Sequence, residues 1–166
     1  YYYEPGSGIL ASGRYLQVGD DQWMYFKHDG SLAIGQVRAD GGYLKYFDKN
    51  GIQVKGQTII EDGHTYYYDA NSGALVTSSF AEIAPNQWSY FNTDGQALKG
   101  KWTINGKEYY FDQNGIQYKG KAVKVGSRYK YYDENDGQPV TNRFAQIEPN
   151  VWAYFGADGY AVTGEQ

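Results

Sequence analysis

Two pairs of side chains in this sequence have the types and the spacing that suit binding of a polar ligand. Gln53 precedes Lys55 by two residues, and Gln117 precedes Lys119 in the same way 64 residues later. Residues two apart in an extended segment point to the same side, so each pair presents an amide next to an ammonium group. These groups supply donors and acceptors for sugar hydroxyls, and a tyrosine ring would cover the apolar face of a pyranose. The sequence therefore predicts two ligand sites whose groups would complement a pyranose, with a solvated polar edge as the alternative.

The two glutamines depart from the rest of the sequence at one recurring position, the second residue after a repeated glycine. The other occupants of this position are apolar or small: Leu10, Leu32, Leu75, Ala97, Pro139 and Ala161. Because side chains alternate along an extended segment, we expect all four Gln and Lys side chains to face solvent. Ile52 and Val54, or Ile116 and Tyr118, should then face the core.

No pattern indicates catalytic residues, a metal site or a cofactor. His28 and His64 are the only histidines, and neither lies in a metal-ligand pattern. Acidic residues gather in turns, where a short carboxylate bonds to its own backbone, so a carboxylate pair for glycoside hydrolysis is not expected. The chain contains no cysteine, which excludes a disulfide scaffold and a thiolate metal site.

The charge and hydropathy patterns exclude two classes of partner. The formal net charge is -4 and no run of Lys or Arg occurs, so binding to nucleic acid or to an anionic membrane is not expected. No apolar stretch approaches the roughly 20 residues that span a bilayer. We therefore predict neither a nucleic-acid partner nor membrane insertion.

A repeated frame organises the chain: a tyrosine, a second aromatic residue, a polar turn and a glycine. The glycines recur in steps of 20 to 22 residues, at Gly8, Gly30, Gly51, Gly73, Gly95, Gly115, Gly137 and Gly159. Three frames make a longer period of 64 or 65 residues, marked by Trp23, Trp88 and Trp152. Such periods are typical of repeat arrays. We expect a single repeat domain over residues 1–166, with units of about 1–56, 57–120 and 121–166.

Each frame reads as a β-hairpin. Asn105 and Gly106 lie between two short strands, and Asn-Gly is a strong hairpin signal. The aromatic residues alternate with period 2, and no helical period occurs. A lone hairpin is marginal in water, so we predict an all-β fold, a β-solenoid of stacked β-hairpin repeats with three hairpins per turn of 64–65 residues. The aromatic pairs should form the ladder that packs repeat on repeat.

The segments YFDKNGIQVKG at 46–56 and YFDQNGIQYKG at 110–120 resemble the glucan-binding repeats of glucansucrases. Those are secreted bacterial glucosyltransferases that build α-glucans such as dextran from sucrose, and the resemblance covers essentially the whole chain. It implies a non-catalytic, extracellular or cell-wall-associated module that binds α-glucan and supports a catalytic domain of the same polypeptide. The chain would then be a fragment of a larger protein.

The resemblance also implies roles for individual residues. The sugar-binding residues would be Gln53, Lys55 and Tyr25 in one pocket, and Gln117, Lys119 and Tyr90 in the other. Tyr67 and Tyr131 are the second choice for the ring that stacks on the sugar. No complete third pocket is expected, because the last Trp-bearing frame has no Gln-x-Lys segment after it.

Two alternatives remain open. The frame is also similar to choline-binding repeats, in which a tryptophan usually follows the second glycine of the frame and helps to enclose a quaternary ammonium group. Here that position holds Gln36, Gln57, Lys101, Lys121 and Glu165, which argues against choline. The other alternative is a structural spacer that binds no ligand.

Overall fold

The computed structural model describes residues 1–162 of the 166-residue chain, so Glu165 and the end of the expected third unit lie outside the described residues. The regular structure is β-strand apart from one 3-10 turn, η1 (Asp40–Gly42). The strands are β1 (Arg14–Gly19), β2 (Gln22–Phe26), β3 (Gly35–Ala39), β4 (Tyr43–Phe47), β5 (Gln57–Glu61), β6 (His64–Tyr68), β7 (Ser79–Ala84), β8 (Gln87–Phe91), β9 (Gly100–Ile104), β10 (Lys107–Phe111), β11 (Lys121–Val125), β12 (Arg128–Tyr132), β13 (Arg143–Glu148) and β14 (Val151–Phe155).

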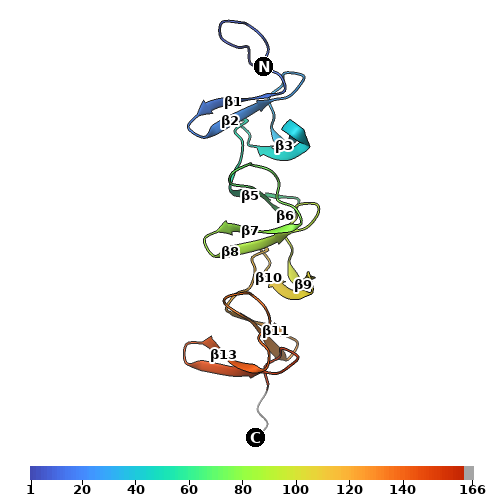
Figure 1. Cartoon of the computed structure of the whole chain (residues 1–166), viewed down its shortest axis with the longest axis vertical. Helices are drawn as coiled ribbons and strands as arrows, with labels where there is room; N and C mark the ends of the chain where they lie inside the picture. Colours follow the sequence, from blue (N-terminus) through green and yellow to red (C-terminus); the bar gives the residue numbers. More distant parts are fainter. Residues whose placement is uncertain (163–166) are drawn as a thin grey trace. The chain divides into compact units, whose positions relative to one another are not determined.

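The strands pair in sequence order into seven two-stranded sheets, from β1–β2 to β13–β14 (Figure 1). In β9–β10 the turn residues Asn105 and Gly106 have φ of 51° and 79°. A type I′ turn needs positive φ at both positions, which explains the Asn-Gly sequence. The predicted hairpins and the all-β class are confirmed.

The aromatic pairs form the predicted ladder. The second ring of a pair is almost completely buried in six hairpins, at Phe47, Tyr68, Phe91, Phe111, Tyr132 and Phe155. The first ring of one hairpin packs on the second ring of the next: the centroids of Tyr25 and Phe47 lie 6.2 Å apart, and those of Tyr131 and Phe155 lie 6.0 Å apart. Small residues complete these clusters, such as Ala33 beside Tyr25. Burial of large rings between hairpins is therefore the main source of stability.

The repeated glycines receive a side chain from the preceding repeat. Gly51 has a φ of 81°, and a Cβ added there would lie 2.6 Å from Leu32 Cδ2. The same contact recurs along the chain, and we call it the glycine seat: the second residue after one repeated glycine lies against the next repeated glycine. Its occupants include Leu10, Leu32, Gln53, Leu75, Ala97 and Gln117. Glycine is thus required both by its backbone conformation and by close packing.

Two compact units make up the chain. Unit 1 comprises residues 1–83 and 91–96, and unit 2 comprises residues 84–90 and 97–166, of which 97–162 are described. The expected division into three units, and three hairpins per turn, stay predictions. No helix among the described residues is long and apolar enough to cross a membrane.

Candidate functional site

The segment that carries Gln117 and Lys119 is held between two hairpins by its backbone. The N–H of Gln117 donates to the carbonyl of Trp88, at 2.7 Å, and the N–H of Tyr118 donates to Tyr110, at 2.8 Å. A turn fixes the start of the segment, since Asp112 Oδ1 accepts the N–H of Ile116 at 2.9 Å. Both edges of this extended segment are therefore bonded, which fixes the direction of each side chain.

The equivalent segment of unit 1 has the same bonds. The N–H of Gln53 donates to the carbonyl of Trp23, and the N–H of Val54 donates to Tyr46, both at 2.8 Å. Asp48 Oδ1 accepts the N–H of Ile52 at 2.9 Å. Two copies of one arrangement thus occur, one in each unit.

The glutamines are not solvent-facing, so the expected orientation is wrong for them. Gln117 is only 8% exposed, and a Cβ added at Gly137 would collide with its Nε2. Gln53 is half-buried and lies in the same way against Gly73. The physical reason is the glycine seat, which covers the second residue after each repeated glycine. Gln53 Nε2 is buried and has no hydrogen-bond partner among the described residues.

Lys119 lies beside a tryptophan that was not among the sugar-binding residues predicted from the sequence. Lys119 is half-buried, and its Nζ lies 5.6 Å from the ring centroid of Trp88, within the range of a cation–π contact. Trp23 occupies the matching place in unit 1, because its carbonyl accepts from Gln53. The sequence did contain a sign of this role, since Trp23 and Trp88 recur in register with the two Gln-x-Lys segments.

The tyrosines proposed as stacking rings are mostly core residues. Tyr25 is 4% exposed and packs in the cluster with Phe47, so its ring has no open face for a sugar. Tyr67 and Tyr131 are also buried in the ladder, whereas Tyr90 is half-buried and its role stays a prediction. The ladder position itself explains this, because the first ring of each pair packs on the next hairpin.

Tyr131 nevertheless borders an open pocket in unit 2, between the β11–β12 and β13–β14 hairpins. The pocket has a volume of about 260 Å³, and Trp152 and Arg143 also line it. Arg143 Nη2 lies 2.5 Å from Asp133 Oδ2, another lining residue. The N–H of Asn135 and the Arg143 guanidinium hold the pKa of Asp133 below its ordinary value. The pocket therefore combines aromatic rings with an ion pair.

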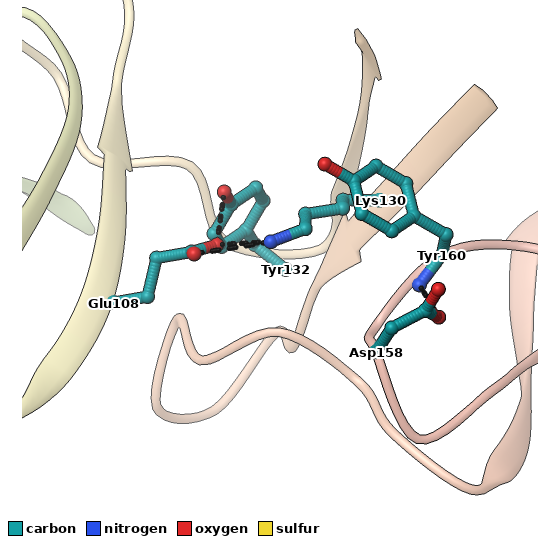
Figure 2. Close-up of polar contacts among 5 residues, drawn as sticks. All are labelled: Glu108, Lys130, Tyr132, Asp158 and Tyr160. Atoms are coloured by element: carbon teal, nitrogen blue, oxygen red, sulfur yellow. Dashed lines mark hydrogen bonds and ion pairs between the residues drawn. The ribbon is translucent and has the colours of Figure 1, made fainter. Parts of the chain in front are cut away.

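A buried polar cluster joins the β9–β10 and β11–β12 hairpins. Figure 2 shows the carboxylate of Glu108 between Lys130 and Tyr132, with the ring of Tyr160 beside Lys130. Lys130 Nζ donates to Glu108 Oε2 at 2.9 Å, and Tyr132 Oη donates to the same oxygen at 2.9 Å. Burial raises the pKa of Glu108, but hydrogen bonds from Lys130 and Tyr132 outweigh it and leave that pKa below its ordinary value. These groups satisfy one another, so the cluster fits a structural role.

Among residues 1–162, no group of three or more His, Cys, Asp or Glu side chains is placed to hold a metal ion. The arrangement that remains is a stack of β-hairpins with polar, aromatic-lined positions between repeats. Such a fold defines a β-solenoid repeat module built from stacked hairpins.

The family comparison agrees with this class. A model described as a choline-binding repeat matches residues 35–80 and 100–144, and one described as a putative cell wall binding repeat matches residues 79–97. The chain belongs to the choline-binding repeat family. Its sequence is also similar to a segment of glucosyltransferases, as the curated relatives show.

Glucosyltransferase-S of Streptococcus mutans serotype c is 37% identical over 99% of this chain, and glucosyltransferase-I of Streptococcus downei is 39% identical over 99%. The chain spans only 11% and 10% of these relatives. The expected resemblance to glucansucrase repeats is thus confirmed. The solved structure of CbpJ from Streptococcus pneumoniae has a TM-score of 0.73 at 20% identity, covering 98% of this chain and 56% of that one. At that identity the likeness shows the fold alone.

Proposed function

We propose that this chain is a carbohydrate-binding module that holds α-glucan at two sites, one in each unit, and serves an attached glucosyltransferase domain. One observation carries the proposal: the same backbone bond joins Gln53 to Trp23 and Gln117 to Trp88, and each glutamine precedes a lysine by two residues. The similarity to about a tenth of two glucosyltransferases supports the glucan and the catalytic partner. The match to a cell wall binding repeat supports a location outside the cell.

In each site the tryptophan replaces the tyrosine as the surface on which the sugar stacks. Trp88 is half-buried, and Lys119 reaches over its ring. A glucosyl unit would slide against the indole while the ammonium donates to its hydroxyls, and the lysine would exchange a cation–π contact for hydrogen bonds. Gln117 lies on the same short segment and supports the lysine by fixing the segment against Gly137.

The expected affinity of one site is low. Stacking on about 60 Å² of sugar face contributes ~1.5 kcal/mol at ~25 cal/mol per Å². Around four hydrogen bonds at a net ~1 kcal/mol each contribute ~4 kcal/mol, against an association cost of at least ~4 kcal/mol. A single site is then near or weaker than millimolar.

The lysine position favours a neutral sugar over choline, despite the family name. The ammonium group of Lys119 already occupies the space above Trp88. A quaternary ammonium ligand would meet a like charge there, which costs free energy in a partly buried site. A polyol has no such conflict, because a hydroxyl accepts a hydrogen bond from an ammonium group.

The test is gel electrophoresis in a native gel that contains dextran, with an unrelated polysaccharide as the control. The binding-deficient variant combines Gln53→Leu, Lys55→Ala, Gln117→Leu and Lys119→Ala. Leucine is chosen because Leu32 and Leu75 occupy the same seat in this chain, so the fold should be preserved. We expect dextran to retard the variant much less than wild type, whereas a control with Lys49→Ala and Gln113→Ala, both exposed, should be retarded like wild type. A folded variant with wild-type retardation would refute the two sites, and a wild-type chain that dextran does not retard would favour the spacer.

A further inference from the structure

The open pocket between β11–β12 and β13–β14 lies outside both Gln-x-Lys sites. Its volume is about 260 Å³, smaller than the ~300–1,000 Å³ of pockets for larger ligands. Its walls include Tyr131, Asp133, Glu134, Arg143, Gln146 and Trp152. Trp152 is 62% exposed, whereas Trp88 is half-buried beneath Lys119. The pocket thus has an accessible indole of a kind that neither Gln-x-Lys site offers.

The residues that line this pocket differ in part from their counterparts 64 residues earlier in the sequence. Tyr131, Asp133 and Trp152 correspond to Tyr67, Asp69 and Trp88, so the aromatic and turn residues are repeated. Glu134 and Arg143 correspond to Ala70 and Ser79. Gln146 corresponds to Glu82, so the later copy carries a guanidinium that its counterpart lacks and has its second carboxylate at a different position.

The guanidinium of Arg143 and the carboxylate of Glu134 suit hydroxyls better than they suit ions. Arg143 is held by Asp133 at 2.5 Å, and its fork of five N–H donors leaves others to offer. Glu134 is exposed and supplies an acceptor, and Gln146, paired in register with Trp152, supplies both. A hydroxyl both donates and accepts, so neighbouring hydroxyls of a pyranose match this combination.

Charged ligands fit less well. An ammonium ligand would be attracted by the carboxylate of Glu134 and by the indole, but it would meet the guanidinium of Arg143 and compete with it for Asp133. An anionic ligand would meet the carboxylates of Asp133 and Glu134, and the only lining cation is already paired with one of them. A neutral sugar ring, stacked on the indole, avoids both conflicts.

We propose that this pocket is a third subsite for a neutral glucosyl unit, built from Trp152, Arg143 and Glu134 in place of a Gln-x-Lys segment. The choice of an α-glucan as ligand rests on the proposed function. The subsite itself uses different residues, so unit 2 would hold the polymer at two places. Arg143 and Glu134 act as the specificity-determining residues, and Asp133 acts as a positioning residue that orients the guanidinium.

The experiment follows the four tryptophan indole N–H signals by NMR during titration with isomaltotriose. Trp152→Phe assigns its signal. The titration is done in the variant with Gln53→Leu, Lys55→Ala, Gln117→Leu and Lys119→Ala, so that the two sites of the proposed function are silent. We expect the Trp152 signal to shift in this variant as in wild type. A Trp152 signal that does not move in either protein would overturn the third subsite, even when the Trp23 and Trp88 signals of wild type do move.

A second variant tests the two specificity residues. Arg143→Ser with Glu134→Ala introduces the residues that the earlier repeat has at these two positions and should keep the fold, because both side chains are exposed. We expect the Trp152 signal of this variant to need at least about tenfold more isomaltotriose for the same shift. When the two substitutions are made in a chain with both Gln-x-Lys segments intact, the titration of the Trp88 signal should stay unchanged. An unchanged Trp152 titration would overturn the assignment of these residues. Choline chloride is the competing probe. If the Trp152 signal shifts at a lower concentration of choline than of isomaltotriose, the choice of a sugar as the ligand is overturned.

Discussion

At the scale of single residues, the glutamine at a glycine seat both fills a packed position and places a polar amide there. Gln53 takes a seat that leucine fills at Leu32 and Leu75, yet its Nε2 is buried without a partner among the described residues. A buried, unpaired donor costs free energy. A costly polar residue at an apolar seat is consistent with selection for ligand binding at the expense of stability.

The glutamine seat gives a prediction for stability. Gln53→Leu should raise the free energy of unfolding by about 1 kcal/mol, because it removes an unsatisfied buried donor and adds apolar contact. The reverse change at the matched seat, Leu75→Gln, should lower it by a similar amount. Urea unfolding followed by tryptophan fluorescence measures both. A Gln53→Leu protein that is less stable than wild type would contradict the packing argument.

The Glu108 cluster gives a prediction for pH. The pKa of Glu108 is lowered in the folded state, so its contribution is present above the unfolded value and is lost as pH falls through the folded value. Glu108→Gln should destabilise the fold at pH 7 by up to about 3 kcal/mol, since it leaves buried Lys130 without its charged partner. The difference from wild type should shrink below about pH 4. Urea unfolding over a pH series measures this, and a difference that is constant with pH would count against the ion pair.

At the scale of elements, the glycines of turns and of seats differ in what they tolerate. Gly106 has a φ of 79° with no atom near an added Cβ, whereas Gly137 has a φ of 69° and lies against Gln117. Positive φ alone costs about 1 kcal/mol for alanine, and a steric clash in a packed position adds 1–3 kcal/mol.

The expected result is therefore that Gly137→Ala destabilises the protein more than Gly106→Ala does. Combining Gly137→Ala with Gln117→Ala should recover part of the loss, because the shorter side chain vacates the seat. Thermal unfolding of the three variants measures the difference. Equal losses for the two single variants would show that the seat is not tightly packed.

The sequence predicted the elements better than it predicted the site. Local turn signals such as Asn105-Gly106 and the period of the aromatic pairs specify hairpins and ladder, and both were found. The predicted direction of the Gln117 side chain was wrong, because the side chain packs against Gly137 of the next repeat. Tyr25 was assigned to the sugar although the ladder buries it. Trp88 could have been predicted as a site residue, because the sequence shows that it recurs in register with the Gln-x-Lys segments.

At the scale of the whole molecule, the arrangement predicts binding that depends on ligand length. Each unit carries one of the proposed Gln-x-Lys sites, at Gln53 in unit 1 and at Gln117 in unit 2. A trisaccharide occupies one site at a time, with the low affinity expected of a single site. A long polymer bound at one site is held near the other at a high effective concentration, which strengthens overall binding by ~10² or more if the chain can span both.

Long dextran should therefore be retained at least about tenfold more strongly, per molecule of ligand, than isomaltotriose. The variant with Gln53→Leu and Lys55→Ala should lose part of this difference, because a long polymer can then engage only the sites proposed in unit 2, while its trisaccharide affinity falls no more than about twofold. Competition titrations with dextrans of increasing length measure both effects on one scale. The double variant serves as its own control, because unit 2 remains intact. Equal affinity of wild type for isomaltotriose and for long dextran would contradict binding at more than one site, since a second site adds nothing unless the polymer engages it.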